Sequence, residues 1–529
     1  MSAAPRRAIN PWFVAVAVVV PTFMEVLDTT IANVALRYIA GGLSAAEIDS
    51  EWVITSYLAA NAFILPMSGW LAAHLGRRNY FLMSIFVFTV SSGLCGMASN
   101  LGELILFRVI QGLAGGGLQP CSQGVLLDAF PPAKQGAAMT VFGFAALVAP
   151  VIGPTLGGYI TDNYEWRWIF YINIPIGAAA LAACYFLLDD PQYLKDERAR
   201  LGSKPLNLDS VGLGLLAIAV VAWEVMLSKG QEWDWLGDPF GRIQTLAACF
   251  VIAGLLFIRR ETRVASPVVN LRPLTNRNFL ACSIIMFLAY AVLYGQTTSL
   301  PAMLQTLFGY DATTSGLVLS PSGIFAVLMM PIVGLLLGRG TDARLLIMGG
   351  LLCMAAGNYW LANLNLKISP GQVIWPRVVL IVGLSMLFAP LNVAAYASIP
   401  KELRGAAVGV FSLLRNEGGS FGTSMAQTIH DRRLQHHTLR LNEWLDPLNQ
   451  NLQDYWTTAR DNLYKLTGDA AAADQTGWQT VSDTLQNQAS SLSYFDVFWL
   501  SAALALALVP LVFLMRRAVA DKGAHLAAE

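Results

Sequence analysis

Apolar stretches long enough to cross a membrane recur along the whole chain. A helix that spans the hydrocarbon core of a bilayer needs about 20 consecutive apolar residues. Hydrophobic residues make up 55% of the chain and charged residues only 13%, whereas soluble domains average about 25% charged residues. We therefore predict an all-α membrane protein with about fourteen transmembrane helices, at 12–36, 51–73, 79–98, 103–126, 135–160, 167–188, 209–228, 241–258, 278–300, 313–338, 344–363, 373–397, 404–429 and 494–516.

The basic residues predict how the chain is oriented. Cytoplasmic loops of membrane proteins carry an excess of lysine and arginine. If the N-terminus is inside, most of the 34 basic residues fall in inner segments. An even number of spans places both termini on the same side, which we expect to be the cytoplasm. The formal net charge is zero, so nothing indicates binding to nucleic acid.

Two long, charged inner loops divide the chain. They lie at 189–208 and 259–277 and bracket the spans 209–228 and 241–258, which leaves six spans before and six after. Transporters are commonly built from repeats, with the site at the interface between them. We predict an N-terminal six-helix half at 1–188, an inserted two-helix hairpin with its flanking cytoplasmic loops at 189–277, and a C-terminal six-helix half at 278–529. The last includes a periplasmic helical hairpin at 431–490, whose apolar residues recur every three or four positions.

The first span carries two acidic residues near its middle, Glu25 and Asp28. A carboxylate at bilayer depth costs about 2.5 kcal/mol or more, and residues three apart lie on one helix face. We therefore expect both to face a polar interior. Because burial favours the neutral form of a carboxyl group, both are predicted to exchange protons during function, and Asp28 is the preferred candidate.

Two further charged residues lie within spans and are predicted to take part. Arg108 keeps its charge at all relevant pH values and can pair with a carboxylate across a cavity, so that protonation of the acid releases it. A static structural ion pair is the alternative. Glu417 lies two residues after Arg415, about 200° away around the helix, so the two cannot simply neutralise each other. Glu417 is a second proton-site candidate, with pairing to another helix as the alternative.

Six stretches, in chain order, resemble one family of transporters: VLDTTIANVAL, GWLAAHLGRR, LILFRVIQGLAGGG, FGFAALVAPVIGPTLGGYI, WRWIFYINIPIG and RGAAVGVFSLLRNEGGSFG. Together they resemble the fourteen-span drug:proton antiporters of the major facilitator superfamily, of the EmrB type. The resemblance implies the major facilitator fold and proton-driven export of hydrophobic toxic compounds by alternating access, with the proton as coupling ion and no cofactor. It also implies an inner-membrane component of a tripartite pump, which works with a periplasmic membrane-fusion adaptor and an outer-membrane channel.

Two of these stretches say more about mechanism. APVIGPTLGG resembles the antiporter motif of drug exporters, in which prolines bend the helix and glycines admit a neighbouring helix; it is expected to seal the outer end of the pathway. GWLAAHLGRR departs from the superfamily pattern, because Ala73 and His74 stand where an aspartate and a basic residue are usual, so a carboxylate of the inner-face charge cluster is missing. The antiporter-motif residues are Pro150, Gly153, Pro154, Gly157 and Gly158.

Aromatic and amide side chains within the spans are candidates for lining a substrate cavity, although packing is the commoner role of a tyrosine in a helix bundle. Glu224 and Asp496 lie near span ends, where we expect solvation at the membrane interface. The cavity candidates are Asn33, Asn61, Tyr290, Tyr294, Gln296, Asn358 and Asn392.

Three other functions compete with multidrug export. One is the export of a single endogenous metabolite, such as a siderophore or a fatty acid. Another is a membrane sensor or scaffold without transport, which acidic residues at mid-depth in both halves disfavour. An intramembrane enzyme is not predicted, because no span holds a histidine well inside it. The six cysteines form no CxxC pair and the histidines lack metal-ligand spacing, so no metal site is predicted.

Overall fold

Helices account for all the regular secondary structure of the part of the chain that is described. The computed structural model describes residues 10–192, 194–196, 198, 209–264, 267–366, 369–400, 403–446 and 448–516, and no strand occurs among them. This confirms the predicted all-α class.

The first helices run from α1 to α10. Several spans consist of two consecutive helices: α3 continues through the short η1 into α4, and α6 continues into α7. The bounds are α1 (Pro11–Gly42), α2 (Glu47–Ser50), α3 (Trp52–Ile64), η1 (Leu65–Met67), α4 (Ser68–Leu75), α5 (Arg77–Met97), α6 (Leu101–Gly115), α7 (Leu118–Ala129), α8 (Pro132–Asn163), α9 (Trp168–Tyr171) and α10 (Asn173–Leu187).

The remaining helices include the longest of the chain, α19 with 39 residues and α21 with 43. The bounds are α12 (Ser210–Lys229), η2 (Trp235–Gly237), α13 (Arg242–Glu261), η3 (Arg272–Thr275), α14 (Arg277–Phe308), α15 (Ala312–Leu319), α16 (Pro321–Gly338), α17 (Ala343–Ala362), α18 (Pro370–Ala397), α19 (Arg404–Asn442), α20 (Gln450–Thr467) and α21 (Ala470–Val512).

Polar caps and prolines fix where many of these helices begin. A side-chain oxygen at the N-cap accepts a hydrogen bond from a backbone N–H of the first turn, which otherwise has no partner. Proline fits the first turn because it has no N–H to leave unpaired. Side-chain caps occur at Asn10, Asn100, Asp209, Asn276, Asp311 and Asp342, and α1, α8, α16 and α18 begin with proline.

Twelve helices or consecutive helix pairs of the described chain are long and apolar enough to cross a membrane, and α8, which bends by 41° near its middle, adds a thirteenth. The fourteenth predicted span, 404–429, lies in α19. This helix is long enough, but Arg404, Arg415 and Glu417 make its first half too polar to count by composition. It nevertheless packs along α14 and α21 inside the bundle, and its charged side chains face protein.

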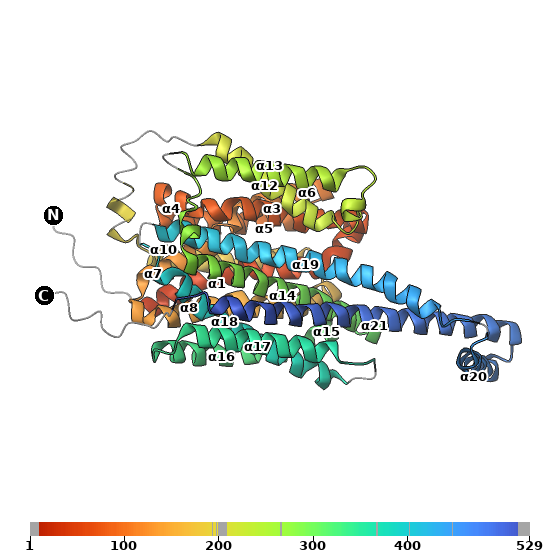
Figure 1. The fold of residues 1–529 in the computed structure, drawn as a ribbon. Coiled ribbons are helices and arrows are strands. Elements are labelled where there is room, and N and C mark those ends of the chain that lie inside the picture. Colours follow the sequence, from red (N-terminus) through yellow and green to blue (C-terminus); the bar gives the residue numbers. More distant parts are fainter. Residues whose placement is uncertain are drawn as a thin grey trace.

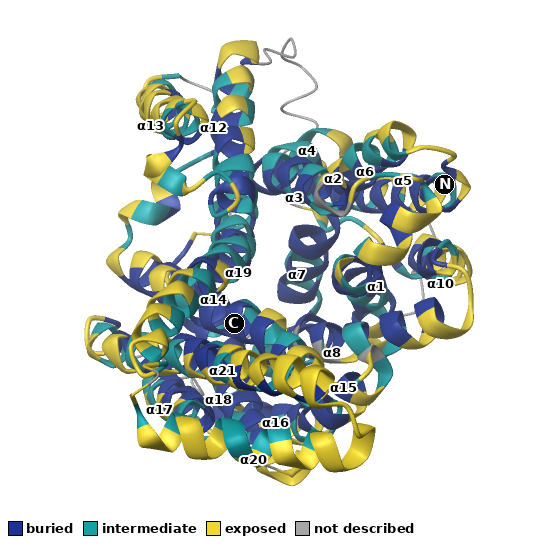
Figure 2. Ribbon diagram, turned by 90° about the vertical axis from the view of Figure 1, so that its right-hand side faces the viewer, coloured by how far each residue is buried: buried dark blue, intermediate teal, exposed yellow. Residues whose placement is uncertain are grey.

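Helices from distant parts of the sequence pack together around the centre of the bundle. Among the helices α1–α10, α1 packs along α8 and α10, and α3 along α6; among α14–α21, α14 packs along α19, and α17 along α18 and α21. The two groups meet where α8 contacts α15, α16 and α18, and where α19 contacts α4 and α7. Figure 2 shows the buried residues of α1, α7, α8, α14 and α19 in the interior.

The pair α12 and α13 lies at the side of this bundle. The two helices pack on each other, and α12 also contacts α3 and α19, so that α13 is the outer member (Figure 2). The Asp209 side chain caps the start of α12, and its carboxylate also accepts a hydrogen bond from Arg260 at the end of α13 at 2.7 Å. This ion pair joins the ends of the two helices.

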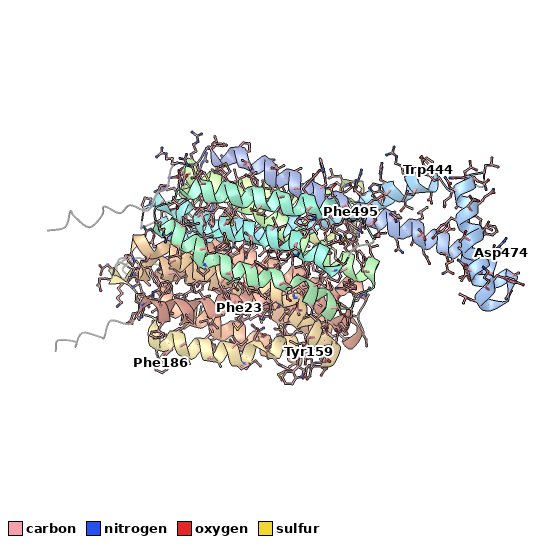
Figure 3. All side chains as sticks on the ribbon, turned by 90° about the horizontal axis from the view of Figure 1, so that it is seen from below. Phe23, Tyr159, Phe186, Trp444, Asp474 and Phe495 are labelled. Carbon is pink, nitrogen blue, oxygen red and sulfur yellow. The ribbon has the colours of Figure 1, made fainter. Side chains whose placement is uncertain are left out.

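The helices α19 and α21 continue well past one end of the bundle and carry α20 at their far end (Figure 1). Trp444 and Asp474 lie on this projection, Tyr159 lies at the end of the bundle nearest to it, and Phe186 lies at the opposite end (Figure 3). The α20 helix packs on α21 through the stacked Trp456 and Trp478, whose ring centroids are 5.5 Å apart.

Candidate functional site

A buried ion pair joins the middle of α1 to α6. Arg108 Nη1 lies 2.5 Å from Asp28 Oδ2, and the two side chains are 0% and 1% exposed. The guanidinium also lies over the Tyr57 ring, 4.2 Å from its centroid, and its Nε donates to the Val53 carbonyl at 3.1 Å. Arg108 therefore pairs with a buried carboxylate, as the sequence suggested. It is also held by contacts with α3, which the sequence did not indicate.

Neutral amides complete the surroundings of Asp28. Its Oδ1 accepts hydrogen bonds from Asn173 Nδ2 at 2.7 Å and from Gln111 Nε2 at 3.1 Å. Gln111 in turn accepts from Arg108 at 2.8 Å, and Asn173 also donates to Ser92 at 3.0 Å. Side chains of α6 and α10 thus bind this carboxylate of α1 directly, and Ser92 of α5 holds Asn173 in place.

Glu25 has a separate set of partners, none of them a basic side chain. Its Oε1 accepts from Asn61 Nδ2 at 3.1 Å and from the Tyr57 hydroxyl at 3.3 Å, and its Oε2 accepts from Gln119 Nε2. Glu25 is 3% exposed. It therefore lies on the same face of α1 as Asp28 but in its own polar cluster, with Tyr57 between the two.

The Glu25 cluster reaches across to α19. The carbonyl of Gln119 accepts a hydrogen bond from Arg415, and Asn416 Nδ2 approaches Asn61 Oδ1 at 3.4 Å. The Arg415 guanidinium also lies 5.7 Å from the Phe142 ring centroid and 5.8 Å from that of Tyr290. A single amide, Gln119, thus links an acid of α1 to a base of α19.

Glu417 lies on the other face of α19, as the helical spacing predicted, and is not near Arg415. It faces Glu224 of α12. Glu224 is only 3% exposed, so the expectation of solvation at the membrane interface is wrong for this residue; packing of α12 on α19 buries it. Asp496, the other acid placed at an interface, is one-third exposed and pairs with Arg433 and His437 at the base of the projection.

The residues predicted to line a substrate cavity do not lie together in the structure. Tyr290 and Tyr294 stack on each other beside Arg415, with ring centroids 6.0 Å apart, and Asn61 belongs to the Glu25 cluster. Asn33 is exposed on α1, outside both clusters. The remaining amides are buried: Gln296 accepts from Arg377, Asn358 donates to the Met354 carbonyl, and Asn392 accepts from Gln123 at 3.3 Å.

The antiporter-motif stretch lies at the bend of α8, where the helix presses against α1. A Cβ on Gly153 would lie 2.0 Å from Thr30 Oγ1, and one on Gly157 would lie 3.3 Å from the Cα of Ile31. The bend follows Pro150, with Pro154 one turn later, and Thr161 donates to the carbonyls of Gly157 and Gly158 at 2.9 and 3.1 Å. These glycines thus bring α8 into backbone contact with α1 just beyond Asp28.

A charge cluster surrounds the loop that carries Arg77 and Arg78, although the loop itself has Ala73 where a carboxylate is usual. Arg77 forms an ion pair with Asp128 at the end of α7, and the backbone N–H of Arg78 donates to Asp190 at 2.8 Å. Gly76 has φ +84°, and a Cβ there would lie 2.8 Å from Asp190. The carboxylates therefore come from other segments and pack against the loop.

Sequence reasoning missed the neutral amides that organise the site. Gln111, Gln119 and Asn173 each bind a carboxylate, and Gln123 joins α7 to Asn392, Tyr396 and Ser412 of α18 and α19. Their signal in the sequence was their position inside apolar spans. Arg377 was missed as well: near the start of α18 it is 2% exposed and binds Gln296 and Thr297.

Comparison with known proteins identifies the family. The family model described as Major Facilitator Superfamily matches residues 19–423. The chain is 36% identical to the multidrug export protein EmrB of Escherichia coli K12 over 500 residues, 94% of each chain. It is 35% identical to the fatty acid resistance protein FarB of Neisseria gonorrhoeae, over 93% of this chain and 94% of that one. It is 29% identical to the colistin resistance protein EmrB of Acinetobacter baumannii, over 92% and 90%.

Solved structures agree on the fold. The human organic anion transporter MFSD10 superposes with a TM-score of 0.60 at 12% identity, covering 96% of this chain and all of that one. The proton:xylose symporter XylE superposes with a TM-score of 0.57 at 14% identity, covering 94% and 96%. Together with the family model and the relatives that align along nearly the whole length, they establish that this chain is a multi-pass membrane protein of the major facilitator superfamily.

Proposed function

We propose that this protein is a proton-coupled multidrug exporter that works by alternating access between its helices α1–α10 and α14–α21. The names of its relatives support multidrug export. The observation that carries proton coupling is the Glu25–Gln119–Arg415 link, because it connects a buried, protonatable group of one set of helices to a cation of the other.

Protonation of Glu25 alters this link directly. The ionised carboxylate accepts hydrogen bonds from Tyr57, Asn61 and Gln119. A protonated carboxyl group gains a donor and loses acceptor strength, so its hold on Gln119 weakens, and with it the hold of Gln119 on Arg415. Proton binding at Glu25 thereby loosens the contact between α7 and α19.

Asp28 and Arg108 supply the second step. When Asp28 is ionised the pair holds α1 against α6, and when Asp28 takes a proton Arg108 is left with Val53, Gln111 and the Tyr57 ring. Since α8 touches α1 at Thr30 and Ile31, a shift of α1 reaches the antiporter-motif glycines. Proton exchange at Asp28 then moves the contact that seals the outer end.

The aromatic side chains beside Arg415 suit hydrophobic substrates. Tyr290 and Tyr294 of α14, Phe142 of α8 and Phe388 of α18 lie around this guanidinium or stack on each other. Aromatic rings offer a large apolar surface on which hydrophobic compounds of different shapes can pack. A drug bound among them would contact Arg415, which is linked to Glu25 through Gln119.

The proposal is tested in proteoliposomes with an imposed pH gradient, using a fluorescent drug. Export is expected to follow the gradient, to stop when an ionophore collapses it, and to be lost in Asp28→Asn and in Glu25→Gln. Asp461→Asn, on the exposed α20, is the control and keeps wild-type transport. Gradient-independent export by the Asp28→Asn, Glu25→Gln double variant would refute proton coupling, and absence of any flux would favour a sensor or scaffold.

Export of one metabolite class is the second candidate, and the similarity to the fatty acid resistance protein supports fatty acids as that class. Arg415 and Arg377 are buried cations that can hold a carboxylate. A substrate panel separates the candidates: a specific exporter moves long-chain fatty acids alone, whereas a multidrug exporter also moves uncharged and cationic dyes.

We further propose that the protein lies in the bacterial inner membrane with both termini in the cytoplasm, and that a periplasmic membrane-fusion adaptor, continued by an outer-membrane channel, binds the projection of α19, α20 and α21. The exposed Trp444, Leu448 and Leu466 on it support an interaction role, since they are 69%, 87% and 83% exposed. Deleting 440–485 should abolish cross-linking to the adaptor and leave transport into vesicles intact. Adaptor binding by the deletion variant would place the dock elsewhere.

A further inference from the structure

A second pair of acidic side chains lies apart from the Glu25 and Asp28 clusters, where α12 packs on α19. Glu224 of α12 and Glu417 of α19 face each other and are 3% and 8% exposed. Ser420, one turn after Glu417, donates to Glu224 Oε1 at 3.1 Å. Within the described chain, neither oxygen of Glu417 has a hydrogen-bond partner in bonding geometry, and the Trp223 side chain is the polar neighbour beside it on α12.

No cation compensates this pair among the residues that are described. The basic and titratable groups of the neighbouring helices are directed to other partners, which leaves the two carboxyl groups to each other. Arg415 of α19 binds Gln119, Lys229 of α12 binds Glu51 and Glu232, Tyr57 of α3 binds Glu25, Arg260 of α13 binds Asp209, Tyr294 of α14 stacks on Tyr290, and Asp496 of α21 binds Arg433.

Aromatic side chains shield the pair. Trp223 precedes Glu224 and lies nearly parallel to Phe421, with an interplanar angle of 5° and ring centroids 6.4 Å apart. Phe250 of α13 packs on Trp223 at 4.8 Å, and Phe287 of α14 packs on Phe421 at 5.6 Å. The rings cover the space between α12, α13, α14 and α19, where Glu224 and Glu417 are buried, so a charge placed there is poorly solvated.

Two ionised carboxylates cannot face each other in such a place, because repulsion and desolvation act in the same direction. One bound proton removes the conflict: it forms an O–H bond on one carboxyl group and is donated to the other. We propose that Glu224 and Glu417 form a proton-binding site through which the inserted pair α12–α13 takes part in proton coupling. The proposal rests on the proton-coupled function proposed above.

The position of Glu417 on α19 connects this site to the residues proposed to couple protons to transport. Glu417 and Arg415 lie two residues apart on nearly opposite faces of one helix, so α19 contacts the Glu224 carboxyl on one side and the Gln119–Glu25 link on the other. With the proton bound, the pair holds α12 to α19. When the proton leaves to water, like-charge repulsion separates the two helices and shifts α19 relative to Gln119.

Infrared difference spectroscopy on the purified protein in lipid nanodiscs tests the site without transport. Wild type is expected to show a protonated-carboxyl stretching band that disappears as pH rises. Glu417→Gln and Glu224→Gln should each lose that component, and Asp28→Asn and the exposed control Glu443→Gln should keep it. Should one glutamine variant fail to fold, the other gives the same readout.

The second readout is the pH profile of export. Both glutamine variants should lose part of the pH dependence of drug transport, and Glu417→Asp should restore it, whereas Glu443→Gln should match wild type. An unchanged band and an unchanged profile in Glu224→Gln and Glu417→Gln would overturn the proposal. Failure of proton-driven export in wild type would instead refute the proposed function, and the infrared titration would still decide whether the pair binds a proton.

Discussion

Neutralising Asp28 alone should cost about as much stability as neutralising Asp28 and Arg108 together. Asp28→Asn leaves the guanidinium in the same place, fully buried and without its carboxylate. Removing one partner of a buried ion pair costs about 3–5 kcal/mol, because an uncompensated charge remains. The contacts of Arg108 with Val53 and Gln111 persist and offset part of this, so we expect a loss of about 3 kcal/mol in the free energy of unfolding.

Arg108→Gln should destabilise the protein by a similar amount, because it leaves the carboxylate with only Gln111 and Asn173. The double variant has no buried charge at this position. It should be about as stable as either single variant, which gives a coupling energy of about 3 kcal/mol, at the top of the range for residues in contact.

The free energies come from reversible unfolding in mixed micelles by titration with a denaturing detergent. The control is Asp461→Asn, the same chemical change in the exposed Arg460–Asp461 pair, where side chains are 36% and 53% exposed. This change should have little effect, because exposed pairs contribute little. Additive losses in the double variant, or a loss at Asp28 no larger than at Asp461, would refute the reasoning.

Three further predictions address the link between helices, the antiporter motif and the turn between α12 and α13. Gln119→Leu should uncouple drug export from the pH gradient while drug binding, measured by tryptophan quenching, persists; full coupling would contradict the role of the amide. Gly153→Val should reduce export, because its Cβ would overlap Thr30, and Thr30→Ala should partly rescue it, whereas Gly41→Ala, where space is open, should be neutral in the same vesicle assay. Hydrogen bonds from Arg242 lower the pKa of Asp238 from 3.8 to about 2; its contribution to stability should therefore be present above pH 4 and fade as pH falls toward 2, so that melting curves of Asp238→Asn and wild type converge at low pH.

The membrane fold was predictable because a bilayer leaves few choices. Every backbone group in it must be paired within the segment, so each apolar run of sufficient length is a helix wherever it packs. The cost of placing a polar group in a bilayer also identified Glu25 and Asp28, because an acid in the middle of α1 is explained only by function or by burial in a polar interior. Arg108 followed as the basic group at similar depth. None of these inferences needs to know which helices are neighbours.

The prediction for Glu224 failed because it depends on which helix packs beside it. Glu224 looks like an interfacial residue from its place near the end of an apolar run, but packing of α12 on α19 buries it opposite Glu417. The carboxylates next to Arg77 and Arg78 come from Asp128 and Asp190, far away in the sequence. The sequence position of a charge near a span end indicates its depth in the membrane but does not indicate which helix packs over it.

The contacts between the two sets of helices near Glu25 are made by amides rather than by ion pairs, and a physical reason supports this. A direct Glu25–Arg415 ion pair in a low-dielectric interior would be strong and costly to break, and would hold α1 and α19 together throughout the cycle. Gln119 places a neutral donor and acceptor between them, so each charge is satisfied by a charge-assisted hydrogen bond rather than by a direct ion pair. Gln123 does the same farther along α7, where it meets Asn392, Tyr396 and Ser412. An interface of this kind can open when one proton binds, which an alternating-access transporter requires.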